Sequence, residues 1–197
     1  LHEDDRVHLI TLSGTQGGDN TPILMDVYSG AVQDIATNVN LDNFGVFVKE
    51  IADTTRPLFL SGEIDYNDGM LRINASETID TTPRHFVNLS KFFLTRKHPT
   101  GKSEGDHVDG GNVQLLASTV ISNDTVTLLS IRLSEPERVA AISYSGTPGG
   151  DDISHPTELD VEVGGFRDIA TNLNNVLIGM QLREIADTTQ PFILSAT

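Results

Sequence analysis

The chain of 197 residues carries 28 acidic and 13 basic side chains, a formal net charge of −15, and 38% of its residues are hydrophobic. A surface this acidic repels phosphate backbones, which argues against nucleic-acid binding, and no apolar run approaches the roughly 20 residues of a membrane-spanning helix. Because the sequence contains no Cys, disulfide bonds and thiol chemistry are excluded.

Short strands separated by turns are predicted along most of the chain. In 69–77 the apolar residues Leu71, Ile73 and Ala75 alternate with polar ones, which is the period of two of a half-buried strand. The strands expected from such patterns are 57–66, 69–77, 86–94, 113–117, 125–133, 139–144, 158–163 and 179–185. Many short strands without long-helix periodicity indicate an all-β, antiparallel β-sandwich.

Turns and one helical turn separate these strands. Asn67-Asp68-Gly69 has the chemistry of a tight turn. Ser134-Glu135-Pro136-Glu137 is a capping box with Pro in the first turn, which predicts one short helical turn. The polar residues 95–112 are expected to form a long exposed loop or a hairpin extension.

The sequence repeats itself with a period of about 134 residues. Residues 34–57 align without gaps on 168–191, an offset of 134 (168 − 34), with 14 identities in 24 positions. Upstream, 1–19 align on 133–151 at an offset of 132 (133 − 1), with 11 identities in 19 positions. The two-residue difference is expected in the loop after Gly-Gly-Asp, because surface loops tolerate insertions. Chance does not produce a match of this density.

The period divides the chain into one whole unit and two fragments. Residues 53–186 are predicted to form one complete repeat, 1–52 the C-terminal part of a preceding repeat, and 187–197 the first strand of the next. Half a sandwich exposes its core face and its sheet edges. Residues 1–52 are therefore expected to need their missing half, from the same long polypeptide or from a neighbouring copy.

The Asp-Thr-Thr-x-Pro sequence that opens each unit, at 53–57 and 187–191, resembles the tandem Ig-like (bacterial Ig-like or cadherin-like) repeats of giant cell-surface proteins, adhesins and surface filaments. Ala75-Ser76-Glu77 at the end of an early strand, and the late Asp-x-Ala-x-Asn, share this resemblance. It implies a spacer, adhesive or polymer-forming role, often with calcium at the domain junctions. Thr37 and Thr171 depart from it, because the family's Asp-x-x-Gly-Asn pattern has Gly there.

Common catalytic motifs are absent from the sequence. It has no nucleophile elbow, phosphate loop or dinucleotide fingerprint, and its six His residues lack metal-ligand spacing. The segment 65–69 echoes a calcium loop, but it lacks the alternating oxygen ligands and the distant Glu, so it is interpreted as a hairpin turn. We therefore expect that the chain is not an enzyme.

Carboxylates are the remaining candidates for a functional site. Calcium takes six to eight oxygen ligands, and a domain junction brings oxygens from several loops together. The alternative is that the Asp and Asn residues that recur in both copies of the repeat form turns by bonding their own backbone. The predicted calcium ligands are Asp34, Asn38, Asp53, Glu77, Asp168, Asn172 and Asp187.

These features predict a non-catalytic structural or adhesive module of a large extracellular or cell-surface protein, forming a filament, fibre or surface lattice with neighbouring copies of the same repeat. Three acceptor sequons, at Asn74, Asn88 and Asn123, are candidate glycosylation sites and favour the extracellular location. The alternative is a carbohydrate-binding or spacer module appended to a secreted hydrolase. Such sites usually stack sugars on exposed aromatic rings, and this chain has no Trp and three Tyr.

Overall fold

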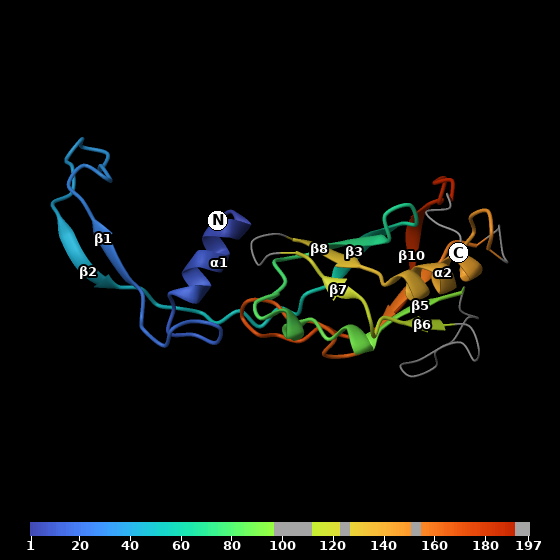
Figure 1. The fold of residues 1–197 in the computed structure, drawn as a ribbon. Coiled ribbons are helices and arrows are strands. Elements are labelled where there is room, and N and C mark those ends of the chain that lie inside the picture. The colour runs from blue at the N-terminus through green and yellow to red at the C-terminus, as the bar shows by residue number, and fades with distance from the viewer. Residues whose placement is uncertain (97–111, 123–126, 151–154, 192–197) are drawn as a thin grey trace, which may run out of the picture. The chain divides into compact units, whose positions relative to one another are not determined.

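The computed structural model describes residues 1–96, 112–122, 127–150 and 155–191, and most of its helices and strands are labelled in Figure 1. The chain divides into two compact units. The N-terminal unit is Leu1–Thr55 with Ile169–Thr171, and the C-terminal unit is Arg56–Asp168 with Asn172–Thr197. Among the described residues, no helix is long and apolar enough to cross a membrane.

The N-terminal unit contains helix α1 (Glu3–Thr11) and the strands β1 (Leu24–Val27) and β2 (Asn43–Phe47). The two strands pair antiparallel as a sheet of their own. All residues of Leu1–Thr55 are described, and none of the apolar side chains among them is buried. This unit therefore has helix and strands but no hydrophobic core.

The described residues of the C-terminal unit form one eight-stranded sheet. Its strands are β3 (Phe59–Asp65), β4 (Met70–Ala75), β5 (Phe92–Thr95), β6 (Asn112–Gln114), β7 (Thr119–Val120), β8 (Leu128–Arg132), β9 (Glu158–Val161) and β10 (Leu177–Ile185). They lie in the order β6-β5-β9-β10-β3-β4-β8-β7. Neighbours are antiparallel, except that β10 and β3 run parallel.

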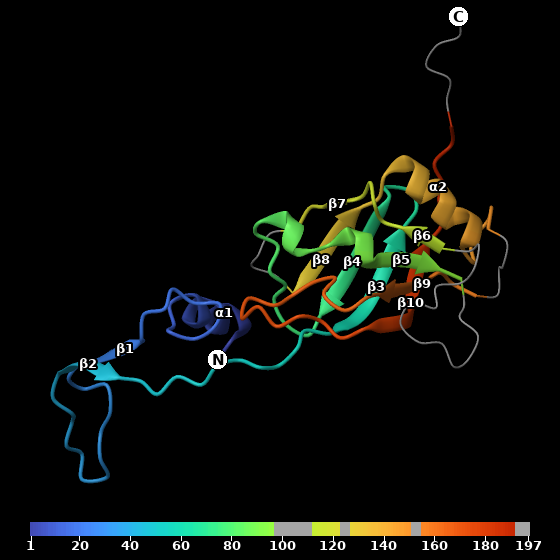
Figure 2. The same ribbon diagram turned by 90° about the horizontal axis from the view of Figure 1, so that it is seen from below.

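The sheet curls around a single core (Figure 2). Leu94 of β5 and Ile73 of β4 belong to the same cluster of buried side chains, although three strands separate them in the sheet. A flat sheet would hold such strands about 19 Å apart, at roughly 4.8 Å per strand. Phe59 and Phe166 stack within this cluster, with ring centroids 3.9 Å apart. The curl thus lets one sheet enclose its own apolar face.

Helix α2 (Glu135–Tyr144) packs against β5 and β6. Its N-terminus has the predicted capping box, in which the hydroxyl of Ser134 and the carboxylate of Glu137 each accept the other's backbone N–H. The helix runs for ten residues, so the strand expected at 139–144 is wrong. The physical reason is that the cap satisfies the first free N–H groups, and Ala141 is buried one turn after Glu137.

The remaining predicted strands are present, and the described chain is largely β as expected. The strand predicted at 86–94 begins only at Phe92, because two 3-10 turns, Arg84–Phe86 and Leu89–Lys91, precede it. Asn88 caps the second turn by accepting the N–H of Ser90.

The predicted turns have two outcomes. Residues 67–69 join β3 to β4, and Gly69 takes the left-handed φ of 69° that this tight turn requires. In the loop expected at 95–112, Thr95 belongs to β5 and Asn112 to β6, and residues 97–111 lie outside the described residues.

Candidate functional site

The recurring sequence folds into the same strand pair in both units. β1 pairs with β2 as β9 pairs with β10, in the same register and with an irregularity at the same place. The equivalent residue pairs, shifted by 134, are Leu24–Phe47 and Glu158–Gln181, Met25–Val46 and Leu159–Met180, and Val27–Asn43 and Val161–Leu177. The sequence repeat is therefore also a repeat of local structure.

The irregularity in each strand pair is held by an Asp carboxylate. The N–H of Gly45 donates to Asp26 at 2.8 Å, and the N–H of Gly179 donates to Asp160 at 2.7 Å. Their φ angles are 67° for Gly45 and 70° for Gly179. A residue without Cβ is favoured in this left-handed conformation, which explains the identical glycines.

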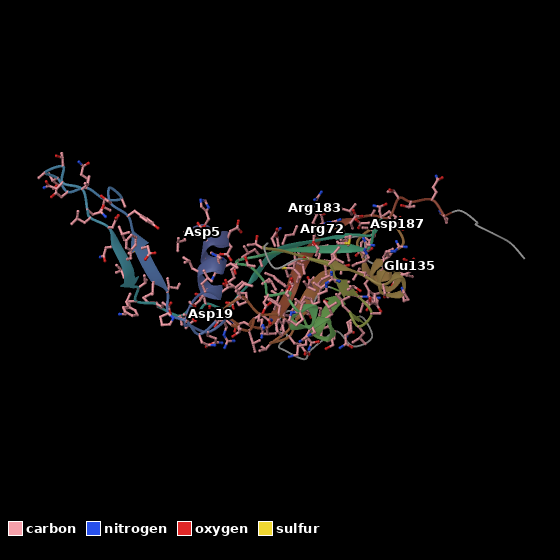
Figure 3. The ribbon with its side chains drawn as sticks, turned by 60° about the vertical axis from the view of Figure 1, so that its left-hand side comes forward. Asp5, Asp19, Arg72, Glu135, Arg183 and Asp187 are labelled. Carbon is pink, nitrogen blue, oxygen red and sulfur yellow. The ribbon has the colours of Figure 1, made fainter. Side chains whose placement is uncertain are left out.

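Arg138 on α2 binds two carboxylates of the C-terminal unit; Figure 3 labels both, Glu135 and Asp187. Its guanidinium donates to Glu135 at 2.7 and 2.8 Å and to Asp187 at 2.7 Å. These hydrogen bonds lower the pKa of Glu135 and of Asp187 and raise that of Arg138. Asp187, a predicted calcium ligand, is therefore the partner of a guanidinium.

Arg6 on α1 makes the equivalent contacts in the N-terminal unit. It donates to both carboxylate oxygens of Glu3 at 2.7 Å and to Asp53 at 2.5 Å. Asp53 also accepts the N–H of Thr55 at 2.9 Å, and Asp187 accepts that of Thr189 at 2.9 Å. A calcium ion would have to compete with Arg6 for Asp53 and with Arg138 for Asp187. The arginines recur at offset 132, and that recurrence was the signal in the sequence.

Glu184 joins three segments of the C-terminal unit. Its carboxylate accepts the N–H of Gly146 at 3.0 Å, the N–H of Thr157 at 3.1 Å and the hydroxyl of Tyr66 at 2.9 Å. Burial and the negative charge of Glu184 raise the pKa of Tyr66 well above its ordinary value. The phenol therefore stays protonated and donates to the carboxylate.

Glu50 makes the same backbone contacts in the N-terminal unit. It accepts the N–H of Gly14 at 3.0 Å and that of Ile23 at 2.7 Å. Sequence reasoning missed Glu50 and Glu184 although both stand in the recurring Glu-Ile-Ala-Asp-Thr-Thr. The prediction selected only the Asp of that motif, Asp53 and Asp187.

The recurring Asp-x-x-x-Asn segments are turns. The carboxylate of Asp34 accepts the backbone and side-chain N–H groups of Asn38, both at 2.9 Å, and these bonds lower the pKa of Asp34. Asp168 and Asn172 make the same two bonds at 2.7 and 2.9 Å. The residue before each Asn is Thr, with φ of 72° or 67° in the region that glycine usually occupies. The tight turn therefore forms without the Gly of the family pattern.

Glu77 and Asp168 are two predicted ligands from separate segments of the C-terminal unit that lie close together. Both are buried, and their carboxylate oxygens lie within 4.8 Å of each other. The N–H of Ser76 donates to the carbonyl of Leu58 at 2.8 Å, so the pair lies beside the start of β3. Two carboxylates this close repel each other unless a proton or a cation neutralises them.

Two of the three predicted glycosylation sites lie on described, exposed residues. Asn74 on β4 donates its side-chain amide to the hydroxyl of Ser61 at 3.0 Å. Asn88 lines a shallow groove of about 370 Å³ together with Val87 and Leu115. Asn123 lies outside the described residues.

Comparisons with known proteins assign no family. No protein-family model matches the chain, and it has no match among the curated proteins or the solved structures.

Proposed function

We propose that the chain is a non-catalytic structural or adhesive segment of a large extracellular or cell-surface protein. It is built from tandem Ig-like β-sandwich repeats of about 134 residues, and it assembles into a filament, fibre or surface lattice. Residues 53–186 are one repeat in this proposal. The single observation that carries it is one strand pair that occurs twice, once inside a closed core and once without one.

The contrast between the two copies supports assembly. In the C-terminal unit, strands β3 and β5 flank the strand pair, and Leu159, Val161 and Leu182 of the pair belong to the buried core. The N-terminal unit has the same strand pair but neither flanking strand. An apolar strand pair with open edges is a site for pairing with another chain. A contact of this kind that does not close on itself produces a filament.

The roles of the bonded carboxylates support a non-catalytic chain. Glu137, Glu184 and Asp160 accept backbone N–H groups at 2.7–3.1 Å, and Asp187 and Glu135 bind Arg138. These contacts are those of side chains that hold a scaffold. The three sequons favour the extracellular location.

The oligomeric state tests this proposal. We expect the full chain to give species larger than a monomer by size exclusion with light scattering, their share rising with concentration from about 1 to 100 μM because the contact is intermolecular. Negative-stain images of the concentrated sample should contain linear assemblies. A chain that stays monomeric over this range, with residues 1–55 resistant to protease, would contradict it.

Calcium belongs to this proposal as the candidate ligand of Glu77 and Asp168. A divalent cation between these buried oxygens would remove their repulsion, and calcium prefers carboxylate oxygens at about 2.3–2.6 Å.

The melting temperature with and without calcium tests this site. Calcium at 100–1,000 times its dissociation constant should stabilise the folded chain by about 3–4 kcal/mol, and chelator should reverse the gain. Glu77→Gln should abolish the response. Asp34→Asn is the matched control, since Asp34 is the exposed equivalent of Asp168 and should keep it. A melting temperature that calcium and chelator leave unchanged would remove calcium from the proposal.

A further inference from the structure

We infer that Asn88 carries an N-linked glycan whose sugars nearest the protein lie in the groove that Asn88 lines. This groove of about 370 Å³ belongs to the C-terminal unit, and its lining residues lie within 84–90 and 115–120. The inference rests on the extracellular location in the proposed function. It selects one of the predicted glycosylation sites and names the surface that the glycan covers.

The side-chain amide of Asn88 is held by its oxygen and leaves its nitrogen available. In the sequon Asn88-Leu89-Ser90, Oδ1 of Asn88 accepts the hydroxyl of Ser90 at 2.6 Å and the backbone N–H of Ser90 at 3.2 Å. Asn88 is exposed, and its Nδ2 donates no hydrogen bond to the residues that the structure describes. The nitrogen that takes the sugar in N-glycosylation is therefore accessible.

The backbone on both sides of Asn88 is fixed. Its N–H donates to the carbonyl of Gly165 at 2.8 Å, and its carbonyl accepts the N–H of Lys91 at 3.0 Å. Asn88 also caps the 3-10 turn Leu89–Lys91. A rigid attachment point holds the first sugar at one place on the surface, which lowers the entropy cost of packing it against the protein.

The lining of the groove offers an apolar surface to a sugar ring. Val87, Leu115 and Val120 contribute buried apolar side chains, and the side chain of Leu116 is 68% exposed. Small-ligand sites of roughly 300–1,000 Å³ are lined mainly by apolar side chains with a few polar groups. The C–H face of a sugar packed here would cover Leu116 and remove apolar surface from water.

Polar side chains of the groove match the hydroxyl groups of a sugar. Arg84, His85 and Thr119 line it and supply N–H and O–H donors. None of the described residues that line it is acidic, in a chain with 28 acidic and 13 basic side chains. A hydroxyl-rich, uncharged glycan core therefore finds donors here and buries no carboxylate.

Asn74, the other described sequon residue, lacks these features. It lies on β4, between β3 and β8, and its Nδ2 donates to the hydroxyl of Ser61 at 3.0 Å. It does not line the groove. The geometry therefore favours Asn88 as the residue whose glycan packs against the protein.

The modification replaces one N–H bond of the Asn88 amide. Nδ2 forms a bond to C1 of the first sugar, while the bond from C1 to the diphosphate of a lipid-linked sugar donor breaks. The diphosphate leaves with the electron pair of that bond, and one amide proton passes to solvent. The oxygen Oδ1 is not consumed, so its bonds from Ser90 persist in the modified chain.

Secretion of the full chain from a eukaryotic host tests the modification. Mass spectrometry of the peptide that contains Asn88 should find a glycan on it. Ser90→Thr keeps the hydroxyl of the sequon and should keep the glycan, whereas Ser90→Ala should abolish it. Circular dichroism of the matched pair checks that both variants fold.

Digestion with an endoglycosidase that cuts beside the first sugar tests the packing. Cleavage at Asn88 should be at least about tenfold slower in the folded than in the denatured chain, the factor that about 1.4 kcal/mol of packing gives. Leu116→Asp should remove this protection but keep the glycan, because it places a charge in the groove. Val139→Asp is the matched control, since Val139 is an exposed apolar residue on α2, and it should keep the protection.

The outcomes separate this inference from the proposed function. An unmodified Asn88 in the secreted parent chain overturns the inference, and so does a glycan that is cut equally fast in the folded chain, the denatured chain and the Leu116→Asp variant. Assembly is measured independently by size exclusion with light scattering. A chain that carries the protected glycan but stays monomeric would contradict the proposed assembly and support the inference. A chain that assembles with Asn88 unmodified would do the reverse.

Discussion

Carboxylates that bind backbone N–H groups recur at the same positions in both units, and their environments differ. Glu184 and its equivalent Glu50 each accept two N–H groups at 2.7–3.1 Å. Glu184 also accepts the hydroxyl of Tyr66, which is fully buried in the C-terminal unit. Hydrogen bonds to a charged group contribute more when the partners left behind are buried. The same Glu therefore stabilises the two units to different degrees.

Glu184→Gln should lower the free energy of unfolding of the C-terminal unit by about 2 kcal/mol. The amide removes the charge and turns one N–H toward a donor of the backbone or of Tyr66. Glu50→Gln is the matched control and should change this transition by less than about 0.5 kcal/mol. Urea unfolding followed by tyrosine fluorescence measures both. Equal effects of the two substitutions would show that Glu184 has no special role.

The recurring Asp residues show how far sequence reasoning reaches at this scale. Repetition alone identified Asp34, Asp53, Asp168 and Asp187 as important, and each makes specific bonds. Their partners depend on tertiary structure: Arg138 is 49 positions from Asp187. The sequence could thus predict which side chains matter but not whether the partner is a metal, a guanidinium or the backbone.

Helices α1 and α2 are equivalent in the repeat, but only α2 has a side-chain cap. Around α2, the carboxylate of Glu137 accepts bonds from Ala117 N–H at 2.7 Å and from the hydroxyls of Ser118 and Ser134 at 2.7 and 2.6 Å. In α1 the cap position is His2, which makes no side-chain cap bond. The capping box therefore both starts α2 and ties it to the segment before β7.

Acid should weaken α2 through Glu137. Burial acts to raise the pKa of Glu137, but the hydrogen bonds from Ser134, Ala117 and Ser118 outweigh it, so the folded pKa is below the ordinary 4.5. A lowered folded pKa gives stability that is complete above the unfolded pKa and is lost as pH falls through the folded value. We therefore expect the melting temperature to decline below about pH 4.5.

Glu137→Gln separates this contribution from general acid unfolding. The variant should be about 2 kcal/mol less stable than the parent chain at pH 7. Its stability should also fall less steeply between about pH 5 and pH 3, the range in which carboxyl groups titrate. Thermal unfolding at these pH values measures both effects. Asp5→Asn, at the equivalent position of the uncapped α1, is the control and should leave the slope unchanged. Parallel pH curves for Glu137→Gln and the parent chain would contradict the assignment.

Elements differ in how well the sequence predicts them. The strand at 69–77 was predictable because its apolar alternation matches its burial. The side chains of Leu71, Ile73 and Ala75 on β4 are buried in the core of the C-terminal unit. Residues 139–144 were misassigned because a short apolar run fits strand and helix alike. The capping box in front of them favoured helix, and it decided the outcome. Strand β7, two residues long, has no local signal and exists through its pairing with β8.

At the scale of the whole molecule, the apolar core is confined to the C-terminal unit. The cluster of buried side chains runs from Phe59 to Leu182 and includes none from Leu1–Thr55. The period predicts that residues 1–52 are only part of a repeat, and this division stays a prediction. The sequence could not predict the curl of the sheet or the parallel pairing of β10 with β3, because both depend on contacts between residues more than 100 positions apart.

The last prediction concerns the local stability of the two strand pairs in dilute solution. Amide exchange reports opening free energies that range from near zero in segments with few buried contacts up to the global value in core strands. At submicromolar concentration, where an intermolecular contact is disfavoured, amides of β1 and β2 should therefore exchange far faster than those of β9 and β10. The two pairs have the same register and the same Asp–Gly bond, so the difference between their exchange rates reports the effect of the core.

Hydrogen exchange of the full chain, followed by mass spectrometry of peptides that cover 24–27 and 158–161, makes the comparison. Raising the concentration into the micromolar range should slow exchange in β1 and β2 and leave β9 and β10 as they were. Equal protection of the two pairs in the dilute chain would mean that the N-terminal unit is stable without a partner strand, and that its open face is not a binding surface.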